Sequence, residues 1–285
     1  MNFWILQILN GISFGMLLFL LASGLSLIFG LLKILNLTHG SFYLFGGYIG
    51  LTIFSKTGSF VLAVISASLI VALIGVVIER VLLRPLHLRE LPQVLLTFGL
   101  LLIFADLAML AWGGNPQTVP RPDFLRSSIQ IGPLVYPSYR LFIIGFGLVI
   151  AALLWWFQDG TKLGAMVRAG VDNEEIARAL GINVSLLFSI VFGIGAFLAA
   201  MGGILGGPIV GVYPGADFEV LLLGFVVVII GGLGSLRGAL FGGLLVGLLD
   251  NFGKVFFPEL ALFTIFAPMV LVLALRPAGL FGRGA

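Results

Sequence analysis

The chain has 285 residues, of which 60% are hydrophobic and 9% are charged, and its mean hydropathy is +1.20. Several apolar runs approach the roughly 20 residues that a helix needs to cross a hydrocarbon core of about 30 Å. With no cysteine and two histidines, the sequence excludes disulfides and thiolate metal sites, and we expect neither a metal nor a cofactor. A net charge of +3 in so apolar a chain is typical of cytoplasmic loops and not of nucleic-acid binding. Composition therefore predicts an all-α polytopic membrane protein in contact with lipid.

About nine transmembrane helices are predicted, within a range of eight to ten. Their bounds lie near 5–31, 35–54, 59–79, 93–112, 140–157, 185–206, 218–231, 238–255 and 260–275. The first lacks a basic n-region and a small-residue cleavage site, so we interpret it as a retained span and not a signal peptide. The seventh is short and the second is polar at its start. Eight crossings with one re-entrant element is therefore a second interpretation.

The distribution of basic residues predicts the orientation. If the N-terminus is outside, most of the fifteen Lys and Arg residues fall in cytoplasmic segments, and the C-terminus is cytoplasmic. Three of these basic residues, Arg80, Arg84 and Arg89, and the adjacent Glu79 are expected to act as anchors at the inner face, with an arginine paired to the glutamate. The alternative is that they contact a neighbouring subunit.

One long outer loop, 113–139, carries five of the twelve prolines, which stiffen a segment without helical or strand periodicity. Two interpretations stay open. The loop presents a docking surface, or it is a connector with Trp112, Tyr136 and Tyr139 as anchors at the membrane interface.

A weak internal repeat predicts two blocks of opposite topology, 5–112 and 185–275, joined by a linking span at 140–157 and a cytoplasmic segment at 159–184, all in one domain. The repeat is carried by Gly-Ser-Phe-Tyr-Leu-Phe-Gly-Gly at 40–47, which resembles Gly-Ala-Leu-Phe-Gly-Gly further on. Inverted blocks are common in transporters. Small residues four apart predict close helix crossings, or helix packing alone, at Gly46/Gly50, Gly234/Gly238, Gly238/Gly242 and Gly243/Gly247.

Charge is concentrated in one short segment. Of the 27 formally charged residues, seven lie there: Asp159, Lys162, Arg168, Asp172, Glu174, Glu175 and Arg178. Such a cluster must lie in water. It is either an ordinary solvated loop or a structured surface that a partner contacts.

The end of this segment predicts a capped helix. Asp172 is expected to accept from the first backbone amides, and Glu175 to complete a capping box. Glu174 favours the positive N-terminal end, and Arg178 lies near the opposite end. Gly181 is expected in the left-handed conformation that closes the helix.

The helix, predicted over 173–180, carries an apolar stripe. Ile176 and Leu180 are four residues apart and share this stripe with Ala177. A second short helix is expected over 163–169 and to end at the following glycine. An apolar ridge flanked by charge suits insertion into a groove on a partner.

Motifs along most of the chain resemble the permease subunits of the branched-chain amino acid class of ABC importers, the LivH type. They run from about residue 10 to 283 and comprise Ile-Leu-Asn-Leu-Thr-His-Gly at 34–40, Ile-Glu-Arg-Val at 78–81 with Arg84-Pro85, Arg168-Ala169 through Ala179-Leu180-Gly181-Ile182-Asn183, Gly-Gly-Leu-Gly-Ser at 231–235, and Arg-Pro-Ala-Gly-Leu-Phe-Gly at 276–282. Arg237 departs from the small residue or proline expected there.

The resemblance implies a permease in the cytoplasmic (inner) membrane of a bacterium or archaeon. It would form a path for branched-chain amino acids with a second homologous permease, two cytoplasmic ATPase subunits and a periplasmic or extracellular substrate-binding protein. The chain itself would not be an enzyme, since it has no Gly-x-x-x-x-Gly-Lys-Ser/Thr phosphate loop. The charged segment would be the ATPase-coupling element, through Arg168, Asp172, Glu174, Glu175, Ile176, Arg178, Leu180 and Gly181.

Polar residues inside predicted spans are candidates for the translocation path. Asn36, Thr38, His39 and Ser41 interrupt apolar sequence, as a zwitterionic solute would require; alternatively they form a capped turn with His39 facing headgroups. Asp106 lies in the fourth span, either inside the bundle or near its outer end.

A last polar candidate, Ser235, ends a glycine-rich segment that is either a gate or a tight turn. Other functions stay open: the same importer class for urea, short amides or other amino acids, or a stand-alone secondary transporter or channel that uses Asp106 as the carrier of a proton or sodium ion.

Overall fold

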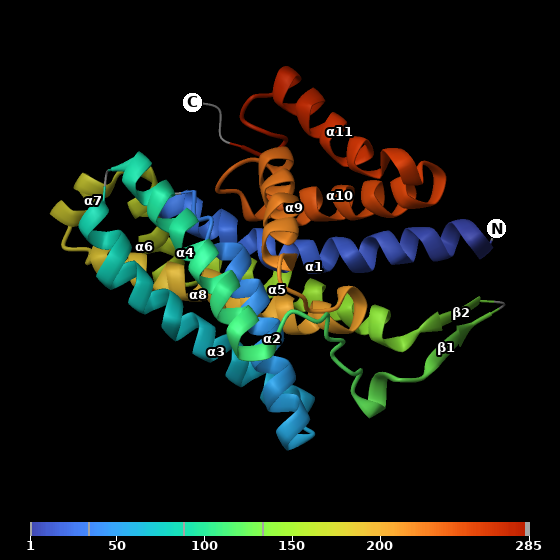
Figure 1. Ribbon diagram of the computed structural model, residues 1–285. Helices are drawn as coiled ribbons and strands as arrows, with labels where there is room; N and C mark the ends of the chain where they lie inside the picture. Colours follow the sequence, from blue (N-terminus) through green and yellow to red (C-terminus); the bar gives the residue numbers. More distant parts are fainter. Residues whose placement is uncertain (1, 34, 88, 133, 283–285) are drawn as a thin grey trace.

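The computed structural model describes residues 2–33, 35–87, 89–132 and 134–282. This part of the chain is a bundle of helices with one small β-hairpin (Figure 1). Seven helical stretches of it are long and apolar enough to cross a membrane: α1 (Asn2–Leu32), α3 with its extension (Phe60–Leu86), α4 (Glu90–Trp112), α5 (Ser138–Gly160), α8 (Val184–Val210), α10 (Leu236–Phe256) and Pro258–Leu275, which contains α11 (Ala261–Leu275). The predicted all-α polytopic membrane protein is confirmed.

Two shorter helices, α2 (His39–Thr57) and α9 (Ala216–Gly231), pack inside the bundle. They correspond to the polar and the short spans of the sequence prediction, and neither combines the length and hydropathy of a full crossing. Their N-terminal ends lie side by side, because a Cβ at Gly40 would overlap the backbone oxygen of Asp217. All nine predicted helices are therefore present, and seven of them have the dimensions of a complete span.

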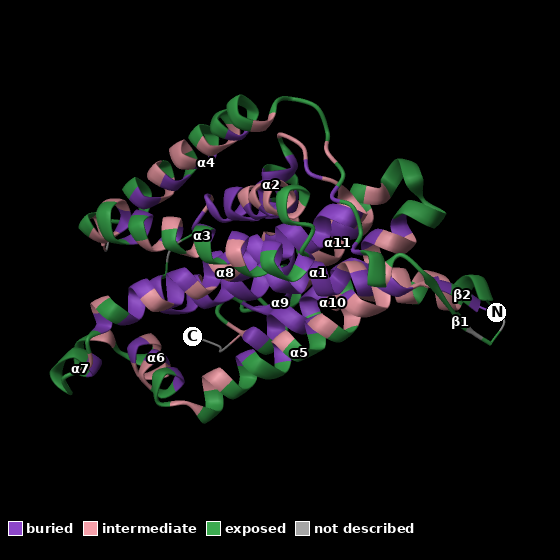
Figure 2. Cartoon of the chain, turned by 90° about the horizontal axis from the view of Figure 1, so that it is seen from below, coloured by how far each residue is buried: buried purple, intermediate pink, exposed green. Residues whose placement is uncertain are grey.

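Helix α1 is the centre of the bundle and packs along α10 and α8. Its most apolar stretch is 94% buried, against 6% for α11 and 17% for α4, and Figure 2 shows buried central helices between more exposed outer ones. The outer helices expose leucine, valine and phenylalanine, as expected of helices that face hydrocarbon chains. The close α1–α10 contact depends on glycine: a Cβ at Gly15 would lie 2.9 Å from the Cα of Leu244.

The 113–139 segment contains a hairpin that the sequence analysis did not predict. Strands β1 (Ser128–Ile131) and β2 (Leu134–Pro137) pair antiparallel, with Ser128 opposite Pro137. Gly132, at φ 59°, has the left-handed conformation of a tight turn. Four-residue strands are too short to give a clear two-residue alternation, which is why the pattern was missed.

The two tyrosines of this segment, Tyr136 and Tyr139, are buried at 1% and 0% exposure, so the interpretation of them as interface anchors is wrong. The Tyr136 hydroxyl lies 3.1 Å from Asn10 Oδ1, and the Tyr139 hydroxyl donates to the Leu205 carbonyl at 2.7 Å. The indole of Trp112 donates to Thr52 Oγ1 at 2.8 Å. Tyrosine hydroxyls and tryptophan N–H groups usually find a hydrogen-bond partner when they are buried.

The end of α3 (Phe60–Ile78) is joined to α8 by a buried ion pair. After α3 the chain forms a π-helical turn (Glu79–Leu83) and a 3-10 turn (Arg84–Leu86). Arg84 donates from Nε and Nη2 to the two Glu79 carboxylate oxygens at 3.0 and 2.9 Å, and Ser189 Oγ of α8 donates to Glu79 Oε2 at 2.7 Å. The predicted Arg–Glu pair is confirmed.

Candidate functional site

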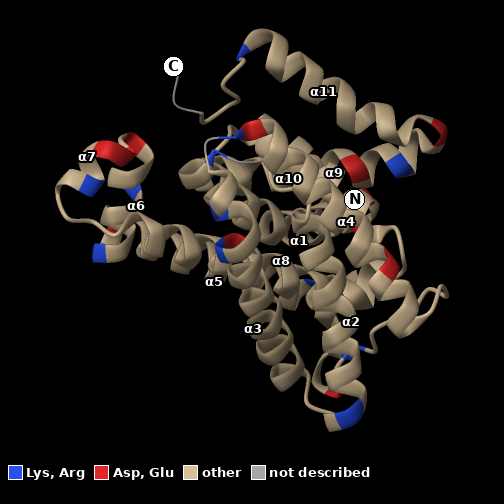
Figure 3. Ribbon diagram, turned by 60° about the vertical axis from the view of Figure 1, so that its left-hand side comes forward, with Lys and Arg blue, Asp and Glu red and all other residues tan. Residues whose placement is uncertain are grey.

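Helices α6 (Lys162–Asp172) and α7 (Glu174–Ala179) hold the charged segment. They project from the end of the bundle opposite the chain's N-terminus (Figure 1), and Figure 3 shows acidic and basic residues gathered on them. The segment is therefore a helical structure and not an irregular loop.

The cap of α7 is one residue later than predicted. Asn173 Oδ1 accepts from the Ile176 amide at 3.0 Å, whereas Asp172 is the last residue of α6. The prediction of an Asp172 cap is wrong because α6 continues through Gly170, so that the chain first becomes extended at Asn173 (φ −158°, ψ 108°). Gly181 has φ 83°, as predicted for the helix end.

Replacing Asn173 with alanine is expected to destabilise α7 by about 1 kcal/mol, because the Ile176 amide loses its acceptor. Asn173→Asp, which keeps a side-chain oxygen, is the matched control. Hydrogen exchange of the α7 amides measures the effect. Equal protection in the two variants would contradict the assignment of the cap.

The predicted ridge has two exposed members. Ile176 is 58% exposed and Leu180 is 74% exposed, whereas Ala177 is 1% exposed and packs against the bundle. Ala177 is therefore on the inner side of α7 and not on the ridge. Two large aliphatic side chains in water, on a capped helix, are typical of a surface that a partner covers.

The charged residues of this segment form two separate groups of ion pairs. Arg178 Nη2 lies 2.7 Å from Glu174 Oε1, and Glu174 Oε2 lies 3.3 Å from Nε2 of His87, which follows α3. Arg168 is paired with Asp159 at 3.3 Å, and Glu175 is exposed. The role of His87 was missed, because a partner 87 residues away leaves no local pattern in the sequence.

The polar residues at the start of α2 and just before it lie deep in the bundle. Asn36, Thr38, His39 and Ser41 are all 0% exposed. Asn36 Oδ1 accepts from the Thr38 amide at 3.1 Å, and His39 Nε2 lies 3.0 Å from the Leu21 carbonyl oxygen of α1. Asn36 thus forms a turn before α2, but no side chain caps the helix, and His39 faces α1 and not the headgroups.

Several polar atoms near the start of α2 and α9 have no hydrogen-bond partner among the described residues. They are Asn36 Nδ2, His39 Nδ1, Ser41 Oγ and Oδ2 of Asp217, a 2% exposed residue of α9. Asp217 is not among the path residues predicted from the sequence, although an acidic residue at the start of an apolar run is a visible signal. Buried polar atoms of this kind carry a desolvation cost unless water or a ligand satisfies them.

The two remaining candidates lie elsewhere. Asp106 is on the exposed surface of α4, outside the polar group at the start of α2. Ser235 caps α10, where its Oγ accepts from the Gly238 amide at 3.0 Å. Neighbouring Gly234 lies against Gly30 of α1, because a Cβ at either glycine would approach the other's Cα. The structure brings four of the six path candidates together and places Asp106 and Ser235 apart from them.

Two short helices that begin inside a bundle of membrane-spanning helices are typical of transporter subunits. This chain belongs to the family described as branched-chain amino acid transport system / permease component, whose model matches residues 7–275. It is therefore a permease of an ABC importer family and a multi-pass membrane protein.

Relatives match the chain over almost its whole length. The high-affinity branched-chain amino acid transport system permease protein BraD of Pseudomonas aeruginosa is 31% identical over 97% of this chain and 95% of BraD. LivH of Escherichia coli K12 is 27% identical over 99% of this chain and 96% of LivH. A solved structure, PsaBC from Streptococcus pneumoniae in complex with Fab, matches 95% of this chain and 92% of its own with a TM-score of 0.52 and 13% identity. At that identity, the likeness concerns the fold alone.

Proposed function

We propose that this chain imports branched-chain amino acids as one of two homologous permeases, with the N-terminus outside. ATP hydrolysis in two cytoplasmic ATPase subunits drives the import, and a substrate-binding protein delivers the amino acid from the other side. The family, BraD and LivH support this cargo. The exposed Ile176–Leu180 ridge supports the coupling role, because the chain must borrow its ATP hydrolysis.

Side-chain contacts connect the Ile176–Leu180 ridge to the membrane-spanning helices. Helix α7 is tied through Glu174 to His87, and the adjacent Glu79–Arg84 pair joins the end of α3 to α8 through Ser189. Displacement of α7 by the ATPases therefore tilts α3 and α8 together, since packed helices move as bodies.

We further propose that the blocks 5–112 and 185–275 are related by inversion, with α1 equivalent to α8 and α2 to α9. The packing supports this relation, because α1 lies along α10 as α8 lies along α3. The glycine-rich strings on α2 and α10 are not equivalent in this scheme. Alternating access arises as the two blocks rock around the polar starts of α2 and α9.

The double variant Ile176→Asp/Leu180→Asp tests the coupling role. Both side chains are exposed, so the fold should persist, while two carboxylates in an apolar groove remove the contact. Expected results are loss of ATPase co-purification and a decrease of roughly tenfold or more in ATP-dependent leucine uptake by proteoliposomes, since removing two central apolar anchors costs at least about 2 kcal/mol.

Phe124→Asp is the matched control, because Phe124 is 65% exposed in the 113–139 segment, away from α7. It should retain the ATPase subunits. Intact ATPase binding and uptake in the double variant would rule out the coupling role. The cargo is tested separately, by uptake of leucine against urea in the wild-type importer, and preference for urea would contradict the branched-chain assignment.

A further inference from the structure

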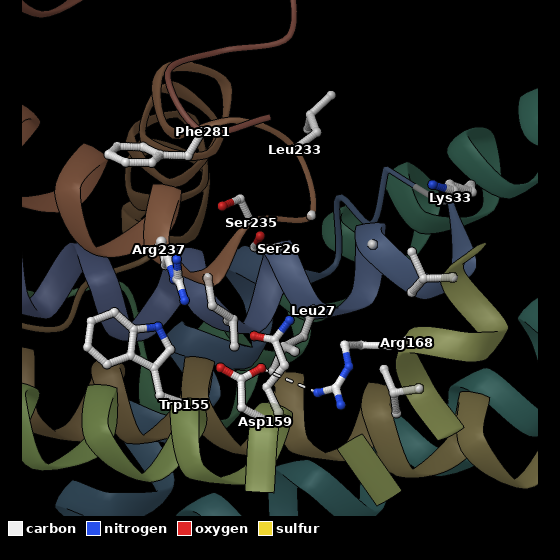
Figure 4. Close-up of a pocket in the computed structure, with 16 residues that line it drawn as sticks. Ser26, Leu27, Lys33, Trp155, Asp159, Arg168, Leu233, Ser235, Arg237 and Phe281 are labelled. Carbon is white, nitrogen blue, oxygen red and sulfur yellow. Dashed lines mark hydrogen bonds and ion pairs between the residues drawn. The ribbon is translucent and has the colours of Figure 1, made fainter. Parts of the chain in front are cut away.

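A cavity of about 440 Å³ opens at the same end of the bundle as α6. Its walls come from the end of α1, from α5 and α6, from the start of α10 and from the segment after α11 (Figure 4). Close approach of Gly30 and Gly234 brings the start of α10 against α1 and shapes one wall. Neither the coupling ridge nor the polar group at the start of α2 contributes to it.

The charged residues in the cavity lining are mainly basic. Lys33, Arg168 and Arg237 face it with one acidic residue, Asp159, which gives a formal charge of +2. Asp159 is occupied by Arg168 at 3.3 Å, whereas Lys33 and Arg237 have exposed side chains.

Two further groups favour an anion. The 21-residue helix α10 begins in the cavity wall, and Ser235 caps only the Gly238 amide. The amides of Leu236 and Arg237 belong to the first turn, which has no intrahelical acceptors and carries the positive end of the helix dipole. Ser26 also lines the cavity, is 1% exposed, and its hydroxyl has no hydrogen-bond partner among the described residues.

The position of the cavity indicates where the anion comes from. Trp155 is 38% exposed and Trp156 is 66% exposed near the end of α5, where an aromatic pair marks the headgroup level of a bilayer. The Arg237 guanidinium carbon lies 6.0 Å from the centre of the Trp155 ring. Arg237 lies beside Trp155 and Ser26 lies next to Ser235 in the cavity lining (Figure 4).

We propose that this cavity binds the phosphate of an anionic phospholipid headgroup from the leaflet that contacts α6. Basic pockets between transmembrane helices bind such headgroups. Lys33 and Arg237 supply the charge, the first turn of α10 supplies amides, and the Ser26 hydroxyl supplies a donor. The bound lipid links α1, α5 and α10 next to the coupling helices.

Native mass spectrometry of the purified full chain tests the site, with phosphatidylglycerol or phosphatidylcholine titrated into the detergent. Wild type should retain phosphatidylglycerol in preference to phosphatidylcholine. Lys33→Gln/Arg237→Gln should weaken phosphatidylglycerol binding roughly 30-fold, because each basic residue near an anionic lipid contributes about a fivefold factor. Asp159→Asn should strengthen it, a gain that misfolding cannot imitate.

The matched control is Lys162→Gln/Arg276→Gln, which removes the same charge from exposed positions outside the cavity. An equal loss in this control, or equal retention of phosphatidylcholine by wild type, would show that no specific headgroup site exists. A second arm adds inorganic phosphate to the phosphatidylglycerol complex. Displacement of the lipid by millimolar phosphate would assign the cavity to a soluble phosphate and overturn the lipid assignment.

Discussion

Glu79→Ala is expected to lower the free energy of unfolding by about 3 kcal/mol. The Glu79 side chain is 1% exposed and accepts from Arg84 and Ser189. Its removal leaves the Arg84 guanidinium without its carboxylate partner, although Arg84 keeps the Ser185 carbonyl and Ser189 Oγ as acceptors. Removing one partner of a buried pair costs roughly 3–5 kcal/mol. The lower end applies here because the Arg84 side chain is 34% exposed and water solvates part of its charge.

Thermal unfolding of the detergent-purified chain, followed by tryptophan fluorescence, measures this loss. Glu90→Ala is the control, since Glu90 is exposed in the first turn of α4. The double variant Glu79→Ala/Arg84→Met should recover much of the stability, because it removes both charges together. If Glu79→Ala unfolds like Glu90→Ala, the ion pair does not hold α3 to α8.

Gly46→Ala is expected to destabilise the chain by about 2 kcal/mol or more, because its Cβ would overlap the backbone of Ala200 where α2 crosses α8. Backbone cannot move aside as a flexible side chain can, so the helices must separate. The crossing supports the polar start of α2, and we expect uptake to fall with stability.

Gly99→Ala on α4 is a matched control. The space around Gly99 is open to 4 Å, so this change should stabilise its helix by up to about 1 kcal/mol through helix propensity alone. The same thermal unfolding assay compares the two. A Gly46→Ala variant as stable as Gly99→Ala would show that the α2–α8 contact is looser than the structure indicates.

Much of the fold follows from local sequence. Apolar runs located the nine helices, and glycine at 46, 50, 243 and 247 marked real helix crossings. The short hairpin was not predicted, and the cap at Asn173 was placed one residue too early. Each depends on only a few residues, and neighbouring residues in the sequence could occupy the same positions equally well. Helix ends carry weak local preferences, whereas a long apolar run carries a large transfer free energy.

Of the candidate site residues, only those with a local sequence pattern were predicted. Ile176 and Leu180 were found because four-residue spacing is visible along a helix. The sequence did not predict the roles of three other residues, because each role joins segments that are far apart in the chain. His87 contacts Glu174, Asp217 lies where α2 and α9 are adjacent, and Ser26 lines the basic cavity.

The sequence by itself determined that the chain is a helical membrane protein, because burial of apolar surface and backbone hydrogen bonding in lipid allow few other solutions. The resemblance of its motifs added the expectation of a permease. Tertiary structure alone decided which polar groups meet: Arg84 with Glu79 and Ser189, His87 with Glu174, and Lys33 with Arg237 around one cavity. These contacts depend on the relative positions of packed helices. The shapes of the side chains between the helices determine those positions, and no single segment of the sequence encodes them.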